Sequence, residues 1–167
     1  QNTSSIVEKT KSMKKMDGFF PFCFFSNNGK IWLLVNQFNT EFLYVNSLPA
    51  GLGSNDIGLD RGQIGNTRIV YFHKVGKKLL LIQPNYDYRA SSKEVQEQKA
   101  VAESFASSAI ASFNIEAEEN GTYLIDLNAF LIRDAHGVAD KIRSMRQGSY
   151  TFNESRSAIY INSTRKL

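Results

Sequence analysis

The sequence predicts an α+β fold, in which a mostly antiparallel β-sheet carries one long packed helix and a second, short helix. Two observations predict the sheet. Apolar segments of strand length alternate with glycine-containing turns, and the chain holds twelve Phe and seven Tyr, which favour strands. A third observation predicts the long helix, because apolar residues recur at helical spacing between Val95 and Phe113. The length of 167 residues suits a single domain.

The first fifteen residues differ in character from the rest. They are polar and rich in lysine, with few apolar side chains. We therefore expect a polar tail over residues 1–15 and a single α+β domain over residues 16–167. A short helix packed on the body of the domain is the alternative for this segment.

The first half of the domain reads as strands joined by tight turns. Asn28-Gly29 supplies the left-handed turn that a hairpin needs, and Gly76 does the same for a second hairpin. The strands expected here are Phe19–Phe25, Lys30–Val35, Glu41–Leu48, Arg68–Lys74 and Lys78–Gln83.

The long helix is expected to begin at a capping box, formed by Ser91 and Glu94, and to run to Phe113. A third hairpin should follow it, with Asn120-Gly121 at the turn. Its arms are Phe113–Glu118 and Tyr123–Leu127.

The second, short helix is expected over Gly137–Gln147, because Asp134 lies where a helix cap would and Gly148 is a natural stop. Two more strands, Tyr150–Asn153 and Ala158–Asn162, would complete the sheet.

A glycine-rich loop between two expected strands is the first candidate for function. It carries five glycines between Gly51 and Gly65, which implies backbone positions that exclude a Cβ. Asp56, Asp60 and Arg61 lie among them, as candidate residues for interaction or for structuring the loop. The two carboxylates could share a Ca²⁺ ion, although we favour hydrogen bonds to their own loop.

Asp134 and His136 form the second candidate surface, at the start of the short helix. Two residues do not make a catalytic triad, and a capping role is favoured for both. A protein zinc site needs three or four ligands, yet His73, His136 and Cys23 lie far apart in the sequence. We therefore assign no catalytic residue and no metal ligand within this chain.

Charge and hydropathy argue against two classes of partner. The formal net charge is +4, and the basic residues are spread rather than gathered with aromatic side chains, so nucleic-acid binding is not expected. No apolar stretch reaches the length of roughly 18 residues that a membrane span requires.

Several strings in the chain resemble one family, and they extend from about Lys14 onward. GLGSNDIGLDRGQ and SRSAIY are the most specific of them. The chain resembles the amino-terminal, non-catalytic region of large bacterial zinc-dependent metalloproteases of the metzincin type. The other strings are KKMDGFFPFCFFSNNGKIWLLV, EFLYVNSLPAGLGSNDIGLDRGQIG, RIVYFHKVGKKLLLIQPNYDYRA, AVAESFASS, LIRDAHGVA and GSYTFNESRSAIY.

This resemblance implies a part of a longer polypeptide, with zinc bound in a catalytic domain downstream. The zinc motif of such proteins lies beyond the matching region, so no catalytic residue transfers to any position here. The resemblance also implies a periplasmic or extracellular location, with the protease domain as partner and a peptide or protein substrate nearby. The expected role is structural, regulatory or substrate-positioning.

Two alternatives stay open. The chain could be an independent module that binds a peptide, a glycan or calcium through its aromatic-rich sheet. Less favoured is an enzyme in its own right, which would need Asp56, Asp60, Arg61, Asp134 and His136 to converge in a pocket.

Overall fold

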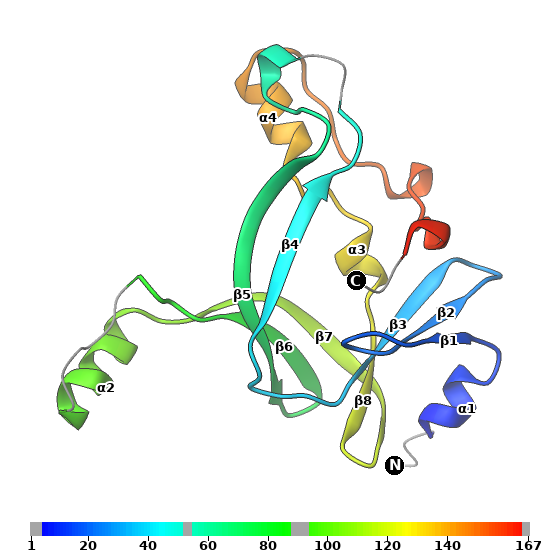
Figure 1. Cartoon of the computed structure of the whole chain (residues 1–167), viewed down its shortest axis with the longest axis vertical. Helices are drawn as coiled ribbons and strands as arrows, with labels where there is room; N and C mark the ends of the chain where they lie inside the picture. The colour runs from blue at the N-terminus through cyan, green and yellow to red at the C-terminus, as the bar shows by residue number, and fades with distance from the viewer. Residues whose placement is uncertain (1–4, 52–54, 88–93, 165–167) are drawn as a thin grey trace.

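The structure is a computed structural model that describes residues 5–51, 55–87 and 94–164. Its centre is an eight-stranded sheet of order β1-β2-β3-β8-β7-β6-β5-β4, in which all neighbouring strands are antiparallel. The sheet curls into a half-barrel (Figure 1). The strands are β1 Lys14–Met16, β2 Phe22–Phe25, β3 Lys30–Val35, β4 Phe42–Leu48, β5 Gln63–Val75, β6 Lys78–Gln83, β7 Ser108–Glu119 and β8 Thr122–Asp126.

The three predicted hairpins are confirmed. In the β7–β8 turn, Asn120 and Gly121 have φ values of 48° and 74°, the left-handed pair that a tight two-residue turn requires. Gly29 and Gly76 likewise have positive φ in the β2–β3 and β5–β6 turns. Turn chemistry therefore predicted strand pairing reliably where the two arms are adjacent in the sequence.

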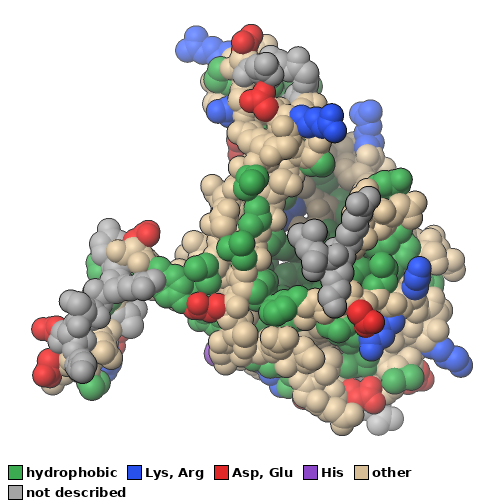
Figure 2. Space-filling view, in the orientation of Figure 1, with side chains coloured by type: hydrophobic (Ala, Val, Ile, Leu, Met, Phe, Trp, Pro, Cys, Tyr) green, Lys and Arg blue, Asp and Glu red, His purple; other side chains and the backbone are tan. Residues whose placement is uncertain are grey.

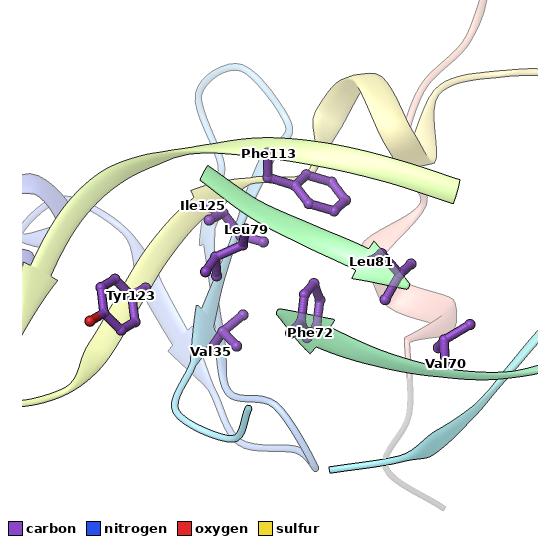
Figure 3. Packing of buried hydrophobic residues seen from close by; sticks show 8 residues of the cluster. All are labelled: Val35, Val70, Phe72, Leu79, Leu81, Phe113, Tyr123 and Ile125. Carbon is purple, nitrogen blue, oxygen red and sulfur yellow. The ribbon is translucent and has the colours of Figure 1, made fainter. Parts of the chain in front are cut away.

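One face of the sheet carries the main core, which is rich in aromatic rings (Figure 3). The ring of Phe72 lies 5.3 Å from Phe20, 5.7 Å from Phe42 and 6.2 Å from Phe113, measured between centroids. Offset and edge-to-face contacts at such distances add to the burial of the rings. The buried members are Val35, Val70, Phe72, Leu79, Leu81, Phe113, Tyr123 and Ile125.

On the opposite face, a short N-terminal helix, α1 Ile6–Thr10, covers the part formed by β2, β3, β7 and β8. Ile6 is buried there beside Cys23, and the Lys9 ammonium donates to the carbonyl oxygen of Glu116 at 2.6 Å. The Ser5 hydroxyl caps the helix by accepting from the Glu8 amide. The structure thus has the packed helix that was our alternative for this segment, and the chain then continues into β1.

The prediction of one long packed helix is wrong. The helix α2 covers only Val95–Ser104, and its described side chains are exposed apart from the half-buried Val101. It projects away from the sheet (Figure 1). The second half of the expected helix, with Phe113, is strand β7, so the fold is mostly antiparallel β with short helices. The expected cap at Ser91 lies outside the described residues.

The reason for this error is a requirement of the neighbouring strand. One edge of β6 pairs with β5, and its other edge would have unpaired amide and carbonyl groups without β7. The register sets Leu79 opposite Phe113 and Leu81 opposite Ala111. A helix satisfies only its own backbone, whereas the strand satisfies both segments and buries Phe113 in the main core.

Two short helices, α3 Asn128–Leu131 and α4 Val138–Ser144, follow the sheet. The predicted second helix is confirmed as α4, although it ends earlier than expected. The prediction of two C-terminal strands is wrong, because residues 150–164 form only the 3₁₀ turns η2 Glu154–Arg156 and η3 Ile161–Ser163. This segment lines a groove with β2 and β3 instead of extending the sheet.

Candidate functional site at the tip of the β4–β5 ribbon

The glycine-rich loop lies at the end of a two-stranded ribbon. The strand β5 is 13 residues long, and only its part from Tyr71 onward pairs with β6. The part from Gln63 to Val70 pairs with β4 alone and extends beyond the rest of the sheet (Figure 1). The loop, with the 3₁₀ turn η1 Asn55–Ile57, and the helix α4 meet at this tip.

The loop is held by its backbone and by two apolar anchors. The Gly62 amide donates to the Leu48 carbonyl at 2.7 Å, and Ile57 and Leu59 are buried. At Gly51, an added Cβ would meet the Arg61 amide nitrogen at 2.9 Å, a distance that real Cβ atoms do not show. The loop therefore does contain a position where two backbone segments approach too closely for any side chain.

Asp134 caps α4, as the sequence predicted. One of its carboxylate oxygens accepts from the Val138 amide at 2.9 Å, and the other accepts from the Ala139 amide at 2.8 Å. These two amides belong to the first turn of the helix and have no partner within the helix itself. Both oxygens of Asp134 thus have a structural role.

His136 lies between the ribbon and the start of α4, and two amide side chains bind its ring. Nδ1 is 3.1 Å from Asn46 Nδ2, and Nε2 is 3.3 Å from Gln63 Oε1. The same Asn46 nitrogen donates to the Ala135 carbonyl at 3.2 Å. Asn46 belongs to β4 and Gln63 to β5, so the imidazole joins both strands of the ribbon to the α3–α4 connection.

The orientation of the two amides suits one tautomer of the ring. Asn46 can only donate through Nδ2, so Nδ1 of His136 accepts, and Gln63 can only accept through Oε1, so Nε2 of His136 donates. A neutral imidazole with its proton on Nε2 satisfies both bonds. The ring is therefore engaged on both sides by neutral groups of the fold.

A groove of about 590 Å³ opens beside this histidine. Of the five sequence candidates, only His136 lines it. Asp56, Asp60 and Arg61 are exposed in the loop and lie outside the lining, so the structure does not bring the five together.

The two loop carboxylates make few contacts. Asp60 accepts from the Gln63 amide only through its backbone carbonyl oxygen, at 3.2 Å. Neither carboxylate has a side-chain hydrogen bond or an ion pair among the described residues. Among all the residues that the structure describes, no group of three or more His, Cys, Asp or Glu side chains could hold a metal ion.

Sequence reasoning missed Asn46 and Gln63, and it placed Gly65 in the loop, whereas the structure places it within strand β5. An added Cβ at Gly65 would lie 2.9 Å from the Cγ of Asn46, so this glycine makes room for the amide that binds His136. The sequence holds a signal for Asn46 and for Gly65. Asn46 interrupts the apolar run of β4, and a glycine inside a strand often marks a close approach.

The groove offers hydrogen bonds and positive charge. Arg68 and Lys141 line it, as does Asp140, which pairs with Arg143 at 3.0 Å. An acid–base pair would need a titratable partner for His136, and its two ring partners are amides instead. The arrangement therefore suits holding the tip together and contacting another molecule better than proton transfer.

Comparison with known proteins gives one result. The family model described as a domain of unknown function, DUF5117, matches residues 62–167. The search of curated proteins and the search of solved structures each return no match. The matched region is more than half of the chain and begins at Gly62, so it contains β5 to β8, the helices α2 to α4 and both Asp134 and His136. The chain therefore belongs to the DUF5117 family.

Proposed function

We propose that this chain is a non-catalytic interaction module of a zinc-dependent metalloprotease, and that it docks on the downstream protease domain through the outer face of the β4–β5 ribbon. The parent class is supported by the resemblance of the strings GLGSNDIGLDRGQ and SRSAIY to the amino-terminal regions of such proteases. The same resemblance supports a periplasmic or extracellular location, with zinc bound downstream.

The observation that carries the docking surface is an exposed apolar face on the ribbon. Leu43 and Ile69 are paired across β4 and β5, and their side chains are 63% and 42% exposed. Val45 and Ile64 continue the same face toward the tip, at 41% and 67% exposed. Apolar side chains run along the ribbon in the space-filling view (Figure 2). Contiguous exposed apolar surface of this kind commonly marks a site of protein interaction.

One further observation supports a non-catalytic role, and another supports docking. Both oxygens of Asp134 and both ring nitrogens of His136 bind groups of the fold itself. These bonds support a structural role for both side chains. Moreover, β4 is an edge strand of the sheet, and an edge with an apolar face is well suited to contact another domain.

The test is binding between this chain and the protease domain encoded downstream in the same gene, measured by calorimetry. Leu43→Lys and Ile69→Lys should each weaken binding by about tenfold or more, because each buries a charge at the interface. Val95→Lys is the matched control, since Val95 is 76% exposed on the remote helix α2, and it should bind like the wild type.

Circular dichroism should show that all three variants keep the fold, because the replaced side chains are exposed. A gene without a zinc-binding H-E-x-x-H segment downstream would overturn the parent class. Absence of binding by the wild type, or full affinity in both ribbon variants, would overturn the docking surface.

A further inference from the structure

A second groove, of about 530 Å³, lies between the C-terminal segment and the sheet. It is separate from the ribbon tip and shares no lining residue with the groove beside His136. Its volume falls within the range of about 300–1,000 Å³ that small-molecule sites occupy. Its apolar lining residues are Phe22, Ile31, Leu33, Leu127, Leu131, Ile132, Phe152, Ala158 and Ile159.

Among the described lining residues, Arg133 is the one cation, and it is held in place by contacts with the fold. The Arg133 guanidinium lies 4.3 Å from the centroid of the Phe130 ring. Its Nε donates to the Phe130 carbonyl at 2.7 Å, and its Nη2 donates to the Tyr44 hydroxyl at 3.0 Å. Tyr44 belongs to β4, so Arg133 is fixed between the α3 region and the opposite end of the half-barrel.

The charge of Arg133 is not compensated within the described residues. Its two hydrogen-bond acceptors are neutral, and none of the ion pairs in this part of the chain involves it. A guanidinium has five N–H donors, and these two bonds leave three for a ligand. A carboxylate matches this remaining fork in both charge and geometry.

We propose that this groove binds an aliphatic monocarboxylate, with the carboxylate on Arg133 and the hydrocarbon chain along the apolar lining. An extended peptide fits less well, because each of its backbone amide and carbonyl groups would need a partner. Among the described lining residues, only Ser157 and Thr164 add polar side chains to that of Arg133. This site does not depend on the docking role proposed for the ribbon.

The test compares sodium octanoate with 1-octanol, a neutral molecule of the same chain length, by calorimetry on the whole chain. The wild type should bind octanoate at least about tenfold more tightly than octanol, because a hydrogen bond to a charged group is among the stronger kinds. Arg133→Met should remove this preference and leave octanol binding unchanged.

Two other variants separate charge from folding. Arg156→Met removes an exposed arginine of the C-terminal segment. Arg156 does not line the groove, so this variant should bind octanoate like the wild type. Ala158→Asp places a carboxylate in the lining and should weaken octanoate binding by about tenfold while affecting octanol less.

Three results would overturn the site. The first is no saturable binding of octanoate to the wild type. The second is octanoate affinity that stays the same in both Arg133→Met and Ala158→Asp. The third is binding of an N-acetylated leucine dipeptide with a free carboxylate, dependent on Arg133, when octanoate does not bind, since the occupant would then be a peptide terminus.

Discussion

Single polar residues hold the tip of the ribbon together. Asp134 uses both carboxylate oxygens on the first turn of α4, and His136 uses both ring nitrogens on the two strands of the ribbon. These bonds connect segments that are far apart in the sequence, since Asn46 and His136 are separated by 90 residues. At this scale, Asp134 and His136 determine how the ribbon tip and α4 are held together.

Replacing Asp134 by alanine should lower the free energy of unfolding by about 0.5–2 kcal/mol, because two amides of the first helical turn lose their partner. Urea denaturation monitored by Trp fluorescence would measure this change. Asp140→Ala is the matched control, since Asp140 is an exposed carboxylate of α4 whose bond to Arg143 contributes little. Equal effects of the two substitutions would show that Asp134 is not a cap.

Among the elements, α2 and β7 show that the same helical spacing can end in two structures. Apolar residues between Val95 and Phe113 fit a helix, but only Val95–Ser104 forms one. From Ser108 onward the chain is strand β7 instead, which pairs with β6 through residues 108–114 and with β8 through residues 115–119. The sheet therefore depends on β7, whereas it gains little from the exposed α2.

A pair of proline substitutions should separate these two elements. Ala100→Pro interrupts α2 and should change the free energy of unfolding by less than about 0.5 kcal/mol, because the exposed helix can unravel without disturbing the core. Ala111→Pro lies within β7 opposite Leu81 and should cost about 3 kcal/mol or more, or prevent folding. Urea denaturation would measure both. A large loss from Ala100→Pro would mean that α2 packs on the domain.

For the whole molecule, the half-barrel has two apolar faces that are covered in different ways. Aromatic rings and α3 fill the inner face, where Phe130 lies 5.6 Å from Phe113 between ring centroids. Over β2, β3, β7 and β8 the outer face is covered by α1, which buries Ile6 against a smaller cluster that includes Cys23. Burial raises the pKa of the Cys23 thiol, although Lys15 and Thr10 act in the opposite direction.

Deleting residues 1–12 should therefore expose the Cys23 thiol and speed its reaction with Ellman's reagent by about tenfold or more. Loss of desolvation lowers the thiol pKa, and the thiolate is the reactive form. The deletion should also lower the free energy of unfolding by about 1.5–3 kcal/mol, the value of burying one large aliphatic side chain. Val7→Lys, an exposed change on the same helix, is the control. Unchanged thiol reactivity in the deletion variant would show that α1 does not cover this face.

The raised thiol pKa also gives a pH dependence. Because the folded state favours the protonated thiol, this contribution to stability is complete below the pKa of an unfolded thiol and is lost as pH rises through the higher folded value. The difference in unfolding free energy between wild type and Cys23→Ala should therefore shrink in alkaline urea titrations. A difference that is constant with pH would contradict the shift.

The candidate site could be predicted only in part. Asp134 as a cap and Gly51 as a close approach follow from local chemistry, and both are present. The partners of His136 could not be named, because Asn46 and Gln63 reach it only once β4, β5 and the α3–α4 connection meet. Arg133 was overlooked for the same reason, since Tyr44 holds it from a distant strand.

The sequence by itself determined the hairpins and the short capped helix, because a glycine at positive φ or a carboxylate beside free amides acts over a few residues. Only the tertiary structure decided that residues 108–119 form a strand and that residues 150–164 stay outside the sheet. The physical reason is that a strand is stable only when another strand satisfies its backbone groups. The open edge of β6 provides that partner to β7. The C-terminal segment pairs with no strand and instead forms one side of an apolar groove.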